Sequence, residues 1–270
     1  MANQHEKGQR FRALHEGPGA FVIPNPWDIG SARILEALGF KALATTSAGS
    51  AFSLGKKDGS LGRDAVLAHA HTIASATELP VSADLENCFG HDPAIVAETI
   101  RLASQTGLVG GSIEDFSRDA GKPIYDFNQA VERVQAAAEA AHSLPFPFTL
   151  TARAENYLHG RPDLDDTIRR LQAFERAGAD VLFAPGITDL PTVKAICSQV
   201  SKPVNVIARK NFSIKDLASA GARRISVGSI LTRVAYHAFL RAAKEVSNQG
   251  TFTFLEESML SAEIPSYMQQ

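Results

Sequence analysis

The segment 148–186, FTLTARAENYLHGRPDLDDTIRRLQAFERAGADVLFAPG, decides the fold, because it contains one complete strand–helix–strand unit. The apolar runs 148–155 and 180–186 have the length of buried strands, and the stretch between them has helical spacing. Ile168, Leu171 and Phe174 form the apolar stripe of that helix, and Asp163 is placed to cap its start. Gly178 ends the helix just before the next strand. The unit predicts two parallel strands with a helix packed outside them.

The same alternation extends over most of the chain. Six further short apolar runs lie at 20–25, 41–47, 80–86, 108–115, 203–208 and 223–229. Eight strands alternating with helices predict a closed (β/α)₈ TIM barrel. An open doubly wound sheet is the alternative, but PNPWDIGSA (24–32) lacks the glycine-rich turn that usually follows its first strand. We therefore predict one barrel domain over residues 1–270, with an additional C-terminal helical tail over about 229–270.

The composition favours an enzyme that acts on small molecules. The chain is 44% hydrophobic and 21% charged, and its formal net charge of −2 argues against nucleic acid or an anionic membrane surface as a partner. No apolar run approaches the ~20 residues of a membrane span, and the N-terminus lacks a signal-peptide core. Two cysteines, Cys88 and Cys197, fit neither a disulfide framework nor a zinc cluster. We expect a cytoplasmic protein.

Acidic side chains follow two neighbouring strands at the edge where barrel enzymes place their active sites. Asp84 and Glu86 lie two positions apart at the end of the third strand, so they point to the same face, and Glu114 ends the fourth. Three carboxylates without a nearby histidine suit a hard cation, so we expect Mg²⁺, with Mn²⁺ as the alternative. Each acid could instead cap the helix that follows it, which is the interpretation we favour for Asp115 and Glu155.

Other polar residues also lie at the strand ends, where a barrel places its active site. Arg153 lies in TLTARAEN (149–156), an otherwise apolar strand, where its charge needs a carboxylate from Glu114, Glu155 or a substrate. Thr46 and Ser47 end the second strand, and Asn205 lies in the seventh.

Five motifs, taken together and in order, resemble the isocitrate lyase/phosphoenolpyruvate mutase superfamily. They are NPWDIGSARILEALGFKALATTSAGSAFSLGKKDG (25–59), ADLENCFG (83–90), GSIEDFS (111–117), TARAEN (151–156) and AFERAGADVLFAPG (173–186). The resemblance implies a Mg²⁺-dependent barrel that acts on small 2-oxo or 2-hydroxy carboxylates. It also implies a homo-oligomer, a tetramer or dimer in which C-terminal helices exchange between subunits.

The resemblance assigns roles to particular residues. Asp84 would approach the metal directly or through water, and Glu86 and Glu114 would mainly hold its waters. Thr46, Ser47 and Ala48 would bind the substrate carboxylate, Arg153 would contact the substrate, and Asp58 would supply an acidic group. Asn205 completes the expected substrate-binding set. Two positions depart from the family pattern: Glu86 stands for an aspartate and Cys88 for a glycine. We expect Cys88 to have a packing or loop role.

The sequence of the loop after the fourth strand narrows the set of activities that we expect. FSRDAGKPIYDFNQA (116–130) contains no cysteine, which argues against isocitrate and methylisocitrate lyase chemistry, and it lacks the Asn-Ser pair of the mutases. We expect this loop, over 116–126, to close as a lid. The expected function is a Mg²⁺-dependent carbon–carbon lyase or decarboxylase, acting on an oxaloacetate-like or substituted malate-like acid through an enolate. The alternatives are phosphorus–carbon bond chemistry on phosphonopyruvate or phosphoenolpyruvate, and a non-catalytic dicarboxylate-binding barrel.

Overall fold

Each apolar run contains a strand that is shorter than the run itself. The computed structural model describes residues 2–268 and gives the strands β1 (Phe21–Ile23), β2 (Leu43–Ala44), β3 (Val81–Asp84), β4 (Gly110–Glu114), β5 (Thr149–Arg153), β6 (Val181–Phe183), β7 (Val204–Ile207) and β8 (Arg224–Ser226). All pair in parallel, in the order β1-β8-β7-β6-β5-β4-β3-β2. The amide of Ala44 donates to the carbonyl of Pro24 at 3.0 Å, which links the two outer strands. The nearly closed (β/α)₈ barrel confirms the predicted fold.

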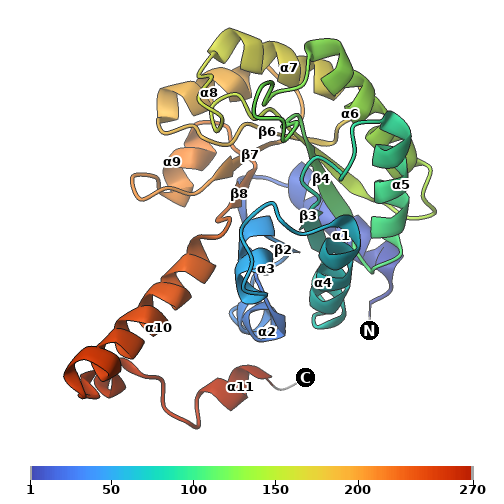
Figure 1. Cartoon of the computed structure of the whole chain (residues 1–270). Coiled ribbons are helices and arrows are strands. Elements are labelled where there is room, and N and C mark those ends of the chain that lie inside the picture. The colour runs from blue at the N-terminus through green and yellow to red at the C-terminus, as the bar shows by residue number, and fades with distance from the viewer. Residues whose placement is uncertain (1, 269–270) are drawn as a thin grey trace.

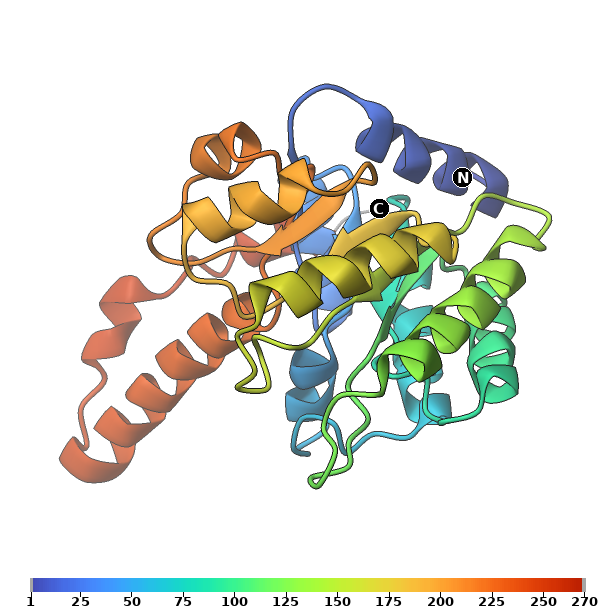
Figure 2. The same cartoon turned by 90° about the horizontal axis from the view of Figure 1, so that it is seen from above.

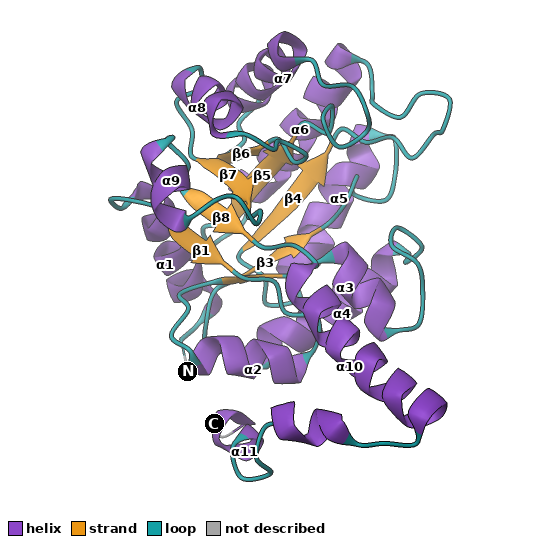
Figure 3. Ribbon diagram, turned by 90° about the vertical axis from the view of Figure 1, so that its left-hand side faces the viewer, coloured by secondary structure: helices purple, strands orange, loops and turns teal. Residues whose placement is uncertain are grey.

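Helices surround the strands on their outer side (Figures 1 and 3). They are α2 (Ile29–Ala37), α3 (Ser47–Ser53), α4 (Arg63–Ser75), α5 (Pro93–Ser104), α6 (Phe127–His142), α7 (Leu164–Arg176), α8 (Leu190–Ser198) and α9 (Ile214–Ser219). In α7, Asp163 caps the start as predicted, accepting from the amide of Asp166 at 2.9 Å.

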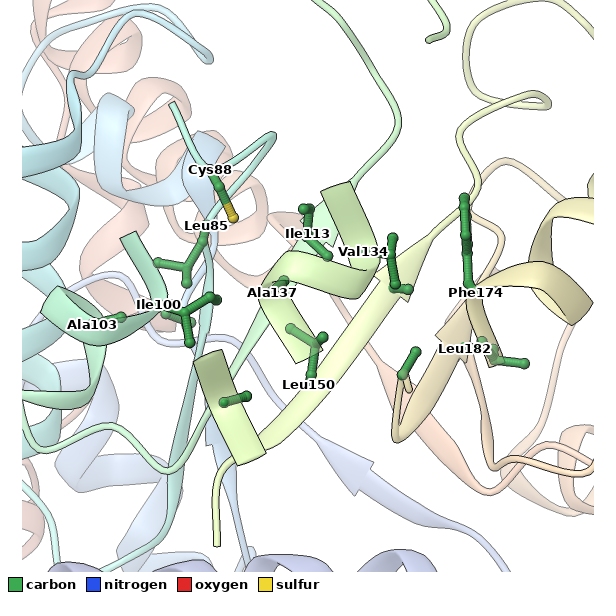
Figure 4. Packing of buried hydrophobic residues seen from close by; sticks show 14 of the residues in the cluster. Leu85, Cys88, Ile100, Ala103, Ile113, Val134, Ala137, Leu150, Phe174 and Leu182 are labelled. Atoms are coloured by element: carbon green, nitrogen blue, oxygen red, sulfur yellow. The ribbon is translucent and has the colours of Figure 1, made fainter. Parts of the chain in front are cut away.

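The main core lies between the strands and these helices. Leu150 on β5 is fully buried, as are Ile100 of α5 and Phe174 of α7, and Figure 4 shows them with Val134 of α6. Cys88 belongs to the same cluster and has no exposed surface, which confirms the expected packing role. Burial raises the pKa of its thiol to about 12, so Cys88 is poorly suited to act as a nucleophile.

A helix that the sequence analysis did not predict closes the opposite end of the barrel. In α1 (Gln4–Glu16), Asn3 and Glu6 form a reciprocal capping box. Phe11 is fully buried against β4, where a Cβ on Gly110 would lie 2.8 Å from its ring. Glycine at position 110 therefore allows the helix to approach the strand.

Arg224 lies buried inside the barrel with neutral partners. Its Nε donates to Oδ1 of Asn205 and its Nη2 to Oγ1 of Thr151, both at 2.9 Å. Its Nη1 lies 3.4 Å from Nε2 of His15. Because Nδ1 of His15 lies 2.8 Å from the carbonyl of Phe11 and donates to it, Nε2 is free to accept. Burial and the charge of Arg224 lower the pKa of His15 to about 3.

Acidification is expected to destabilise the wild-type protein more than a His15→Gln variant. Between pH 6.5 and 3 the unfolded chain binds a proton at this position that the folded chain does not, so stability falls as the pH falls. The difference at pH 4.5 is about 2–3 kcal/mol. Urea unfolding at pH 7 and pH 4.5 measures it, with the exposed His71→Gln as control. An equal pH dependence in wild type and His15→Gln would contradict this assignment.

The chain continues beyond β8 as a long helix that projects away from the barrel (Figures 1 and 2). This helix, α10, spans Ile230–Gln249, within the predicted tail. A short 3₁₀ helix (Thr253–Glu257) follows, and α11 (Ile264–Met268) returns to α2, where Nη1 of Arg33 donates to the carbonyl of Met268 at 3.1 Å. Phe239 and Leu260 remain 73% and 75% exposed, so much of the apolar tail is not buried on its own chain. Within residues 2–268, no helix is long and apolar enough to cross a membrane.

Candidate active site

Three neighbouring strands bring their last residues together at one edge of the barrel. Asp84, Glu114 and Arg153 end β3, β4 and β5, and Glu114 pairs in register with Arg153. The guanidinium of Arg153 contacts Oδ1 of Asp84 at 3.0 Å, Oε2 of Glu114 at 3.2 Å and Oε1 of Glu155 at 2.8 Å. Glu114 and Glu155, the two protein partners that the sequence suggested for Arg153, both contact it. Asp84 contacts it as well.

This cluster has more negative than positive charge. Three carboxylates and one guanidinium leave an excess of two negative charges when all are ionised. Burial raises the pKa of Glu114 well above its usual value, although Arg153 opposes the shift. Burial alone would lower the pKa of Arg153, but the surrounding carboxylates, Glu155 first, raise it. A proton on Glu114 or an added cation would reduce the repulsion.

Asp84 is held in place by donors from the start of α3 and from the turn after β3. Its Oδ2 accepts from the amide of Ser47 at 3.3 Å, and its Oδ1 accepts from the amide of Glu86 at 3.2 Å. The hydroxyl of Ser112 lies 3.5 Å from the same Oδ1, and Oγ1 of Thr45 accepts from the Asp84 amide at 3.0 Å. The carboxylate therefore keeps a fixed position beside Arg153.

A cavity of about 260 Å³ lies next to this cluster. Its lining includes the predicted residues Thr46, Ser47, Ala48, Asp58, Asp84, Arg153 and Asn205. Thr46 caps α3 by accepting from the amide of Gly49 at 3.4 Å, whereas Asp58 is exposed in the loop before α4. Asn205 is buried, and its Nδ2 donates to Oγ of Ser226 at 3.0 Å. Oδ1 of Asn205 accepts from Arg224, which also lines the cavity. The sequence analysis missed Arg224, although it lies in an apolar strand as Arg153 does.

Glu86 pairs with a different arginine from the one that contacts Asp84 and Glu114. It is 6% exposed and forms an ion pair with Arg118, from the loop between β4 and α6. Nη1 of Arg118 also donates to the carbonyl of Gly59 at 3.1 Å, and its guanidinium lies 5.8 Å from the centre of the Phe89 ring. Arg118 therefore connects its own loop after β4 with the loop between α3 and α4 and with the loop after β3. Nothing in the local sequence pattern distinguished it from an ordinary surface arginine.

The predicted metal residues do not form a closed set of direct ligands. Within residues 2–268, no three His, Cys, Asp or Glu side chains are arranged to hold a metal ion. Asp84 and Glu114 both contact Arg153, and Glu86 contacts Arg118. Mg²⁺ takes only one or two protein carboxylates and keeps several waters. The oxygen donors and the excess negative charge are of the kind that suits Mg²⁺.

The expected cap roles of Asp115 and Glu155 were wrong. Asp126 and Asp163 occupy the N-cap positions of α6 and α7 instead. Oδ1 of Asp115 accepts from the amide of Glu155 at 2.8 Å, and its Oδ2 pairs with Nη1 of Arg170 at 3.1 Å. Burial raises the pKa of Asp115 to about 7, against the effect of its hydrogen bonds and of Arg170. The two acids support the strand end that carries Arg153 and do not cap helices.

The loop 116–126 forms a small hairpin beside the site. Phe116 pairs with Ile124 as an antiparallel bridge, and the amide of Ser117 donates to the carbonyl of Pro123 at 2.7 Å. The ring of Phe116 stacks on His159, with centroids 3.8 Å apart and an 8° angle between the planes. A second cavity of about 340 Å³ separates this pair from Glu86, Glu114 and Arg153, all of which line it.

Comparison with curated proteins finds relatives over most of the chain. An uncharacterized protein of Mycobacterium tuberculosis strain CDC 1551 is 32% identical, over 88% of this chain and 89% of its own. The 2-methylisocitrate lyase of Escherichia coli K12 is 28% identical, over 90% and 84%. An oxaloacetate decarboxylase of Pseudomonas aeruginosa strain PAO1 is also 28% identical, over 89% and 84%.

Solved structures show the same fold. A "putative lyase/mutase" from Burkholderia cenocepacia J2315 superimposes with a TM-score of 0.96 and is 55% identical, covering 98% of this chain and 96% of its own. The structure of 2,3-dimethylmalate lyase gives a TM-score of 0.87 with 26% identity, covering 100% and 96%. The family model described as phosphoenolpyruvate phosphomutase matches residues 11–247. With the barrel, the motif order and these relatives in agreement, the chain belongs to the phosphoenolpyruvate phosphomutase family, within the isocitrate lyase/phosphoenolpyruvate mutase superfamily.

Proposed function

We propose that the protein is a Mg²⁺-dependent carbon–carbon lyase or decarboxylase for a small 2-oxo or 2-hydroxy dicarboxylate, of the oxaloacetate or substituted malate type. The observation that carries the proposal is the Arg153 cluster, in which one guanidinium and three carboxylates lie beside a cavity at the carboxyl ends of the strands. The names of the Escherichia coli and Pseudomonas relatives support the same reaction class.

The residues divide the work between binding and charge stabilisation. Thr46, Ser47 and Ala48 lie where a hydroxyl and backbone amides can orient one substrate carboxylate. Arg153 is fixed by its three acidic partners, and it would stabilise the oxygen on which negative charge develops as the bond breaks. Asp84 would hold Mg²⁺, with Glu86 and Glu114 holding its waters. When bound, the ion acts as a Lewis acid toward the substrate oxygens.

Two further residues complete the proposed site. Asp58 lines both cavities from the mouth, where it can exchange protons with solvent and substrate. Asn205 lies deeper, and its position beside Arg224 and Ser226 makes it part of the substrate cavity floor. The loop 116–126 would close over the bound acid and exclude water.

Incubation with a panel of acids tests the proposal. The purified protein is mixed with Mg²⁺ and oxaloacetate, 2,3-dimethylmalate, methylisocitrate or phosphonopyruvate, with and without EDTA, and the products are followed by ¹H and ³¹P NMR. We expect EDTA-sensitive release of a 2-oxo acid from a carbon acid. Turnover of phosphonopyruvate alone would replace the proposal with phosphorus–carbon chemistry. Binding of dicarboxylates without turnover would indicate a non-catalytic barrel.

The assembly that we propose is a homo-oligomer built through α10. This helix carries the exposed side chains of Val234, Phe239 and Leu240, which a single chain leaves uncovered. Light scattering is expected to give a multiple of 28.9 kDa. Phe239→Ser should lower that mass, whereas Lys244→Ser, a polar change on the same helix, should not. A wild-type mass of one chain would contradict the proposal.

The cellular location that we propose is the cytoplasm. Cys88 and Cys197 are both free thiols, as is usual in a reducing compartment. Fractionation of cells that produce the protein would test this location.

A further inference from the structure

We propose that His159 is the proton donor of the reaction, which delivers a proton to the enolate carbon after the carbon–carbon bond breaks. This inference rests on the proposed lyase or decarboxylase function. Such a reaction leaves a carbanion-like carbon that must gain a proton. The loop 116–126 contains no cysteine that could serve as this acid.

Two groups that line the cavity of about 340 Å³ can exchange protons, Asp58 and His159. Asp58 is exposed, whereas His159 is packed between Glu155 and Phe116, so His159 is the one held in a fixed position. Eleven described residues line the cavity, among them Asp58, Glu114, Arg153, Glu155 and His159. Among these described residues, His159 is the one histidine, and none is a cysteine, lysine or tyrosine. Imidazole is the side chain used most often for proton transfer near neutral pH. Glu114, the other acid that burial could keep protonated, is engaged by Arg153.

His159 is held beside Glu155 by its side chain and by its backbone. Its Nε2 lies 3.6 Å from Oε2 of Glu155, and its backbone amide donates to the carbonyl of Glu155 at 3.1 Å. Glu155 is 1% exposed and also binds Nε of Arg153. The carboxylate thus connects the proposed proton donor to the guanidinium that stabilises the enolate. Within the described residues, Nδ1 of His159 has no hydrogen-bond partner, so it is the nitrogen free to act.

The ring of His159 also contacts the loop 116–126, which we propose to act as a lid. Phe116, at the start of the loop 116–126, stacks flat on the imidazole. The His159 side chain is 24% exposed, which gives it access to solvent for reprotonation. Closure of the loop would therefore fix the orientation of the ring when substrate is bound.

The proton transfer balances without any additional reactant. For an oxaloacetate-like acid, the bond to the departing carboxylate breaks, CO₂ leaves, and the electron pair forms the enolate. The enolate then restores its carbonyl while its carbon takes the proton from Nδ1 of the imidazolium. A C–H bond forms, an N–H bond breaks, and neutral imidazole remains. Solvent returns the proton before the next turnover.

Stereospecific labelling tests the role of His159. Wild type, His159→Gln, His159→Phe and the control His71→Gln are compared in D₂O with 3-methyloxaloacetate, and the configuration at C3 of the 2-oxobutanoate product is measured. We expect one configuration from wild type and from the control. In both His159 variants we expect kcat to fall 10²–10³-fold with little change in KM, and the product to be racemic because solvent protonates the released enol.

The outcomes separate this inference from the function on which it rests. His159→Phe retains a ring that can stack on Phe116, so activity in this variant with loss only in His159→Gln would show a structural role and overturn the proposal. A single product configuration from both variants at wild-type kcat would overturn it as well. Absence of turnover in wild type with every acid of the panel would overturn the proposed function, and this inference with it. Near-UV circular dichroism checks that the variants are folded.

Discussion

Replacement of Arg153 with methionine is expected to lower kcat/KM by roughly a thousandfold, the upper range for loss of one preorganised charge donor. The guanidinium contacts Asp84, Glu114 and Glu155 at once, so it can stabilise an enolate only where these carboxylates hold it. Steady-state kinetics with the substrate identified from the panel measures the loss. We expect most of it in kcat, since the charge develops as the bond breaks.

The same change should also destabilise the fold at neutral pH. Removal of one partner from a buried ionic cluster typically costs about 3–5 kcal/mol, because the remaining carboxylates have no cation. Arg153→Lys separates the two effects, since it keeps the charge and loses the three-way contact. The exposed Arg176→Met is the matched control and should leave both quantities unchanged. Near-normal kcat/KM in a folded Arg153→Met variant would remove Arg153 from the proposed site.

The second large effect is expected from Asp84→Asn. The amide has the shape of the carboxylate and can still accept from the Ser47 amide, but it lacks the charge that would hold a divalent cation. We expect kcat/KM to fall by about two orders of magnitude or more, since even outer-shell changes at metal sites cost 10–100-fold. The Mg²⁺ concentration needed for half-maximal activity should rise in parallel.

Metal binding provides a measurement that does not depend on turnover. Titration with Mn²⁺, followed by electron paramagnetic resonance, is expected to show one site in wild type and a greatly weakened site in Asp84→Asn. Asp165→Asn, an exposed change on α7, serves as the control and should bind Mn²⁺ as wild type does. Equal Mn²⁺ affinity in wild type and Asp84→Asn would contradict the assignment of Asp84 to the metal.

The parts of the fold that were predicted correctly depend on local patterns. All eight strands lie within the apolar runs, and the helix over Ile230–Gln249 follows β8 as expected. Asp163 caps α7, because an N-cap depends only on residues three positions apart. The helix α1 was missed, since its sequence is largely polar and Phe11 is buried by a strand about one hundred positions later.

For the site, the contacts that could be proposed from the sequence differ from those that could not in the same way. Asp84, Glu114 and Arg153 could be proposed because parallel strands place their carboxyl ends at one edge of the barrel. Asp115 was expected to cap a helix, yet its partner is Arg170, 55 positions away. His159 gave no signal in the sequence, because its interest arises from stacking on Phe116 and from the nearby Glu155 carboxylate.

The sequence by itself determined the alternation of strands and helices, the barrel, and the charged residues Asp84, Glu114 and Arg153 at the strand ends. Hydrophobic periodicity and caps are properties of neighbouring residues, so they can be recognised without coordinates. The tertiary structure alone decided which charges pair: Arg153 with Asp84, 69 positions away, and Arg118 with Glu86. Burial makes each of these pairings energetically important, and both burial and pairing depend on side chains that only folding brings together.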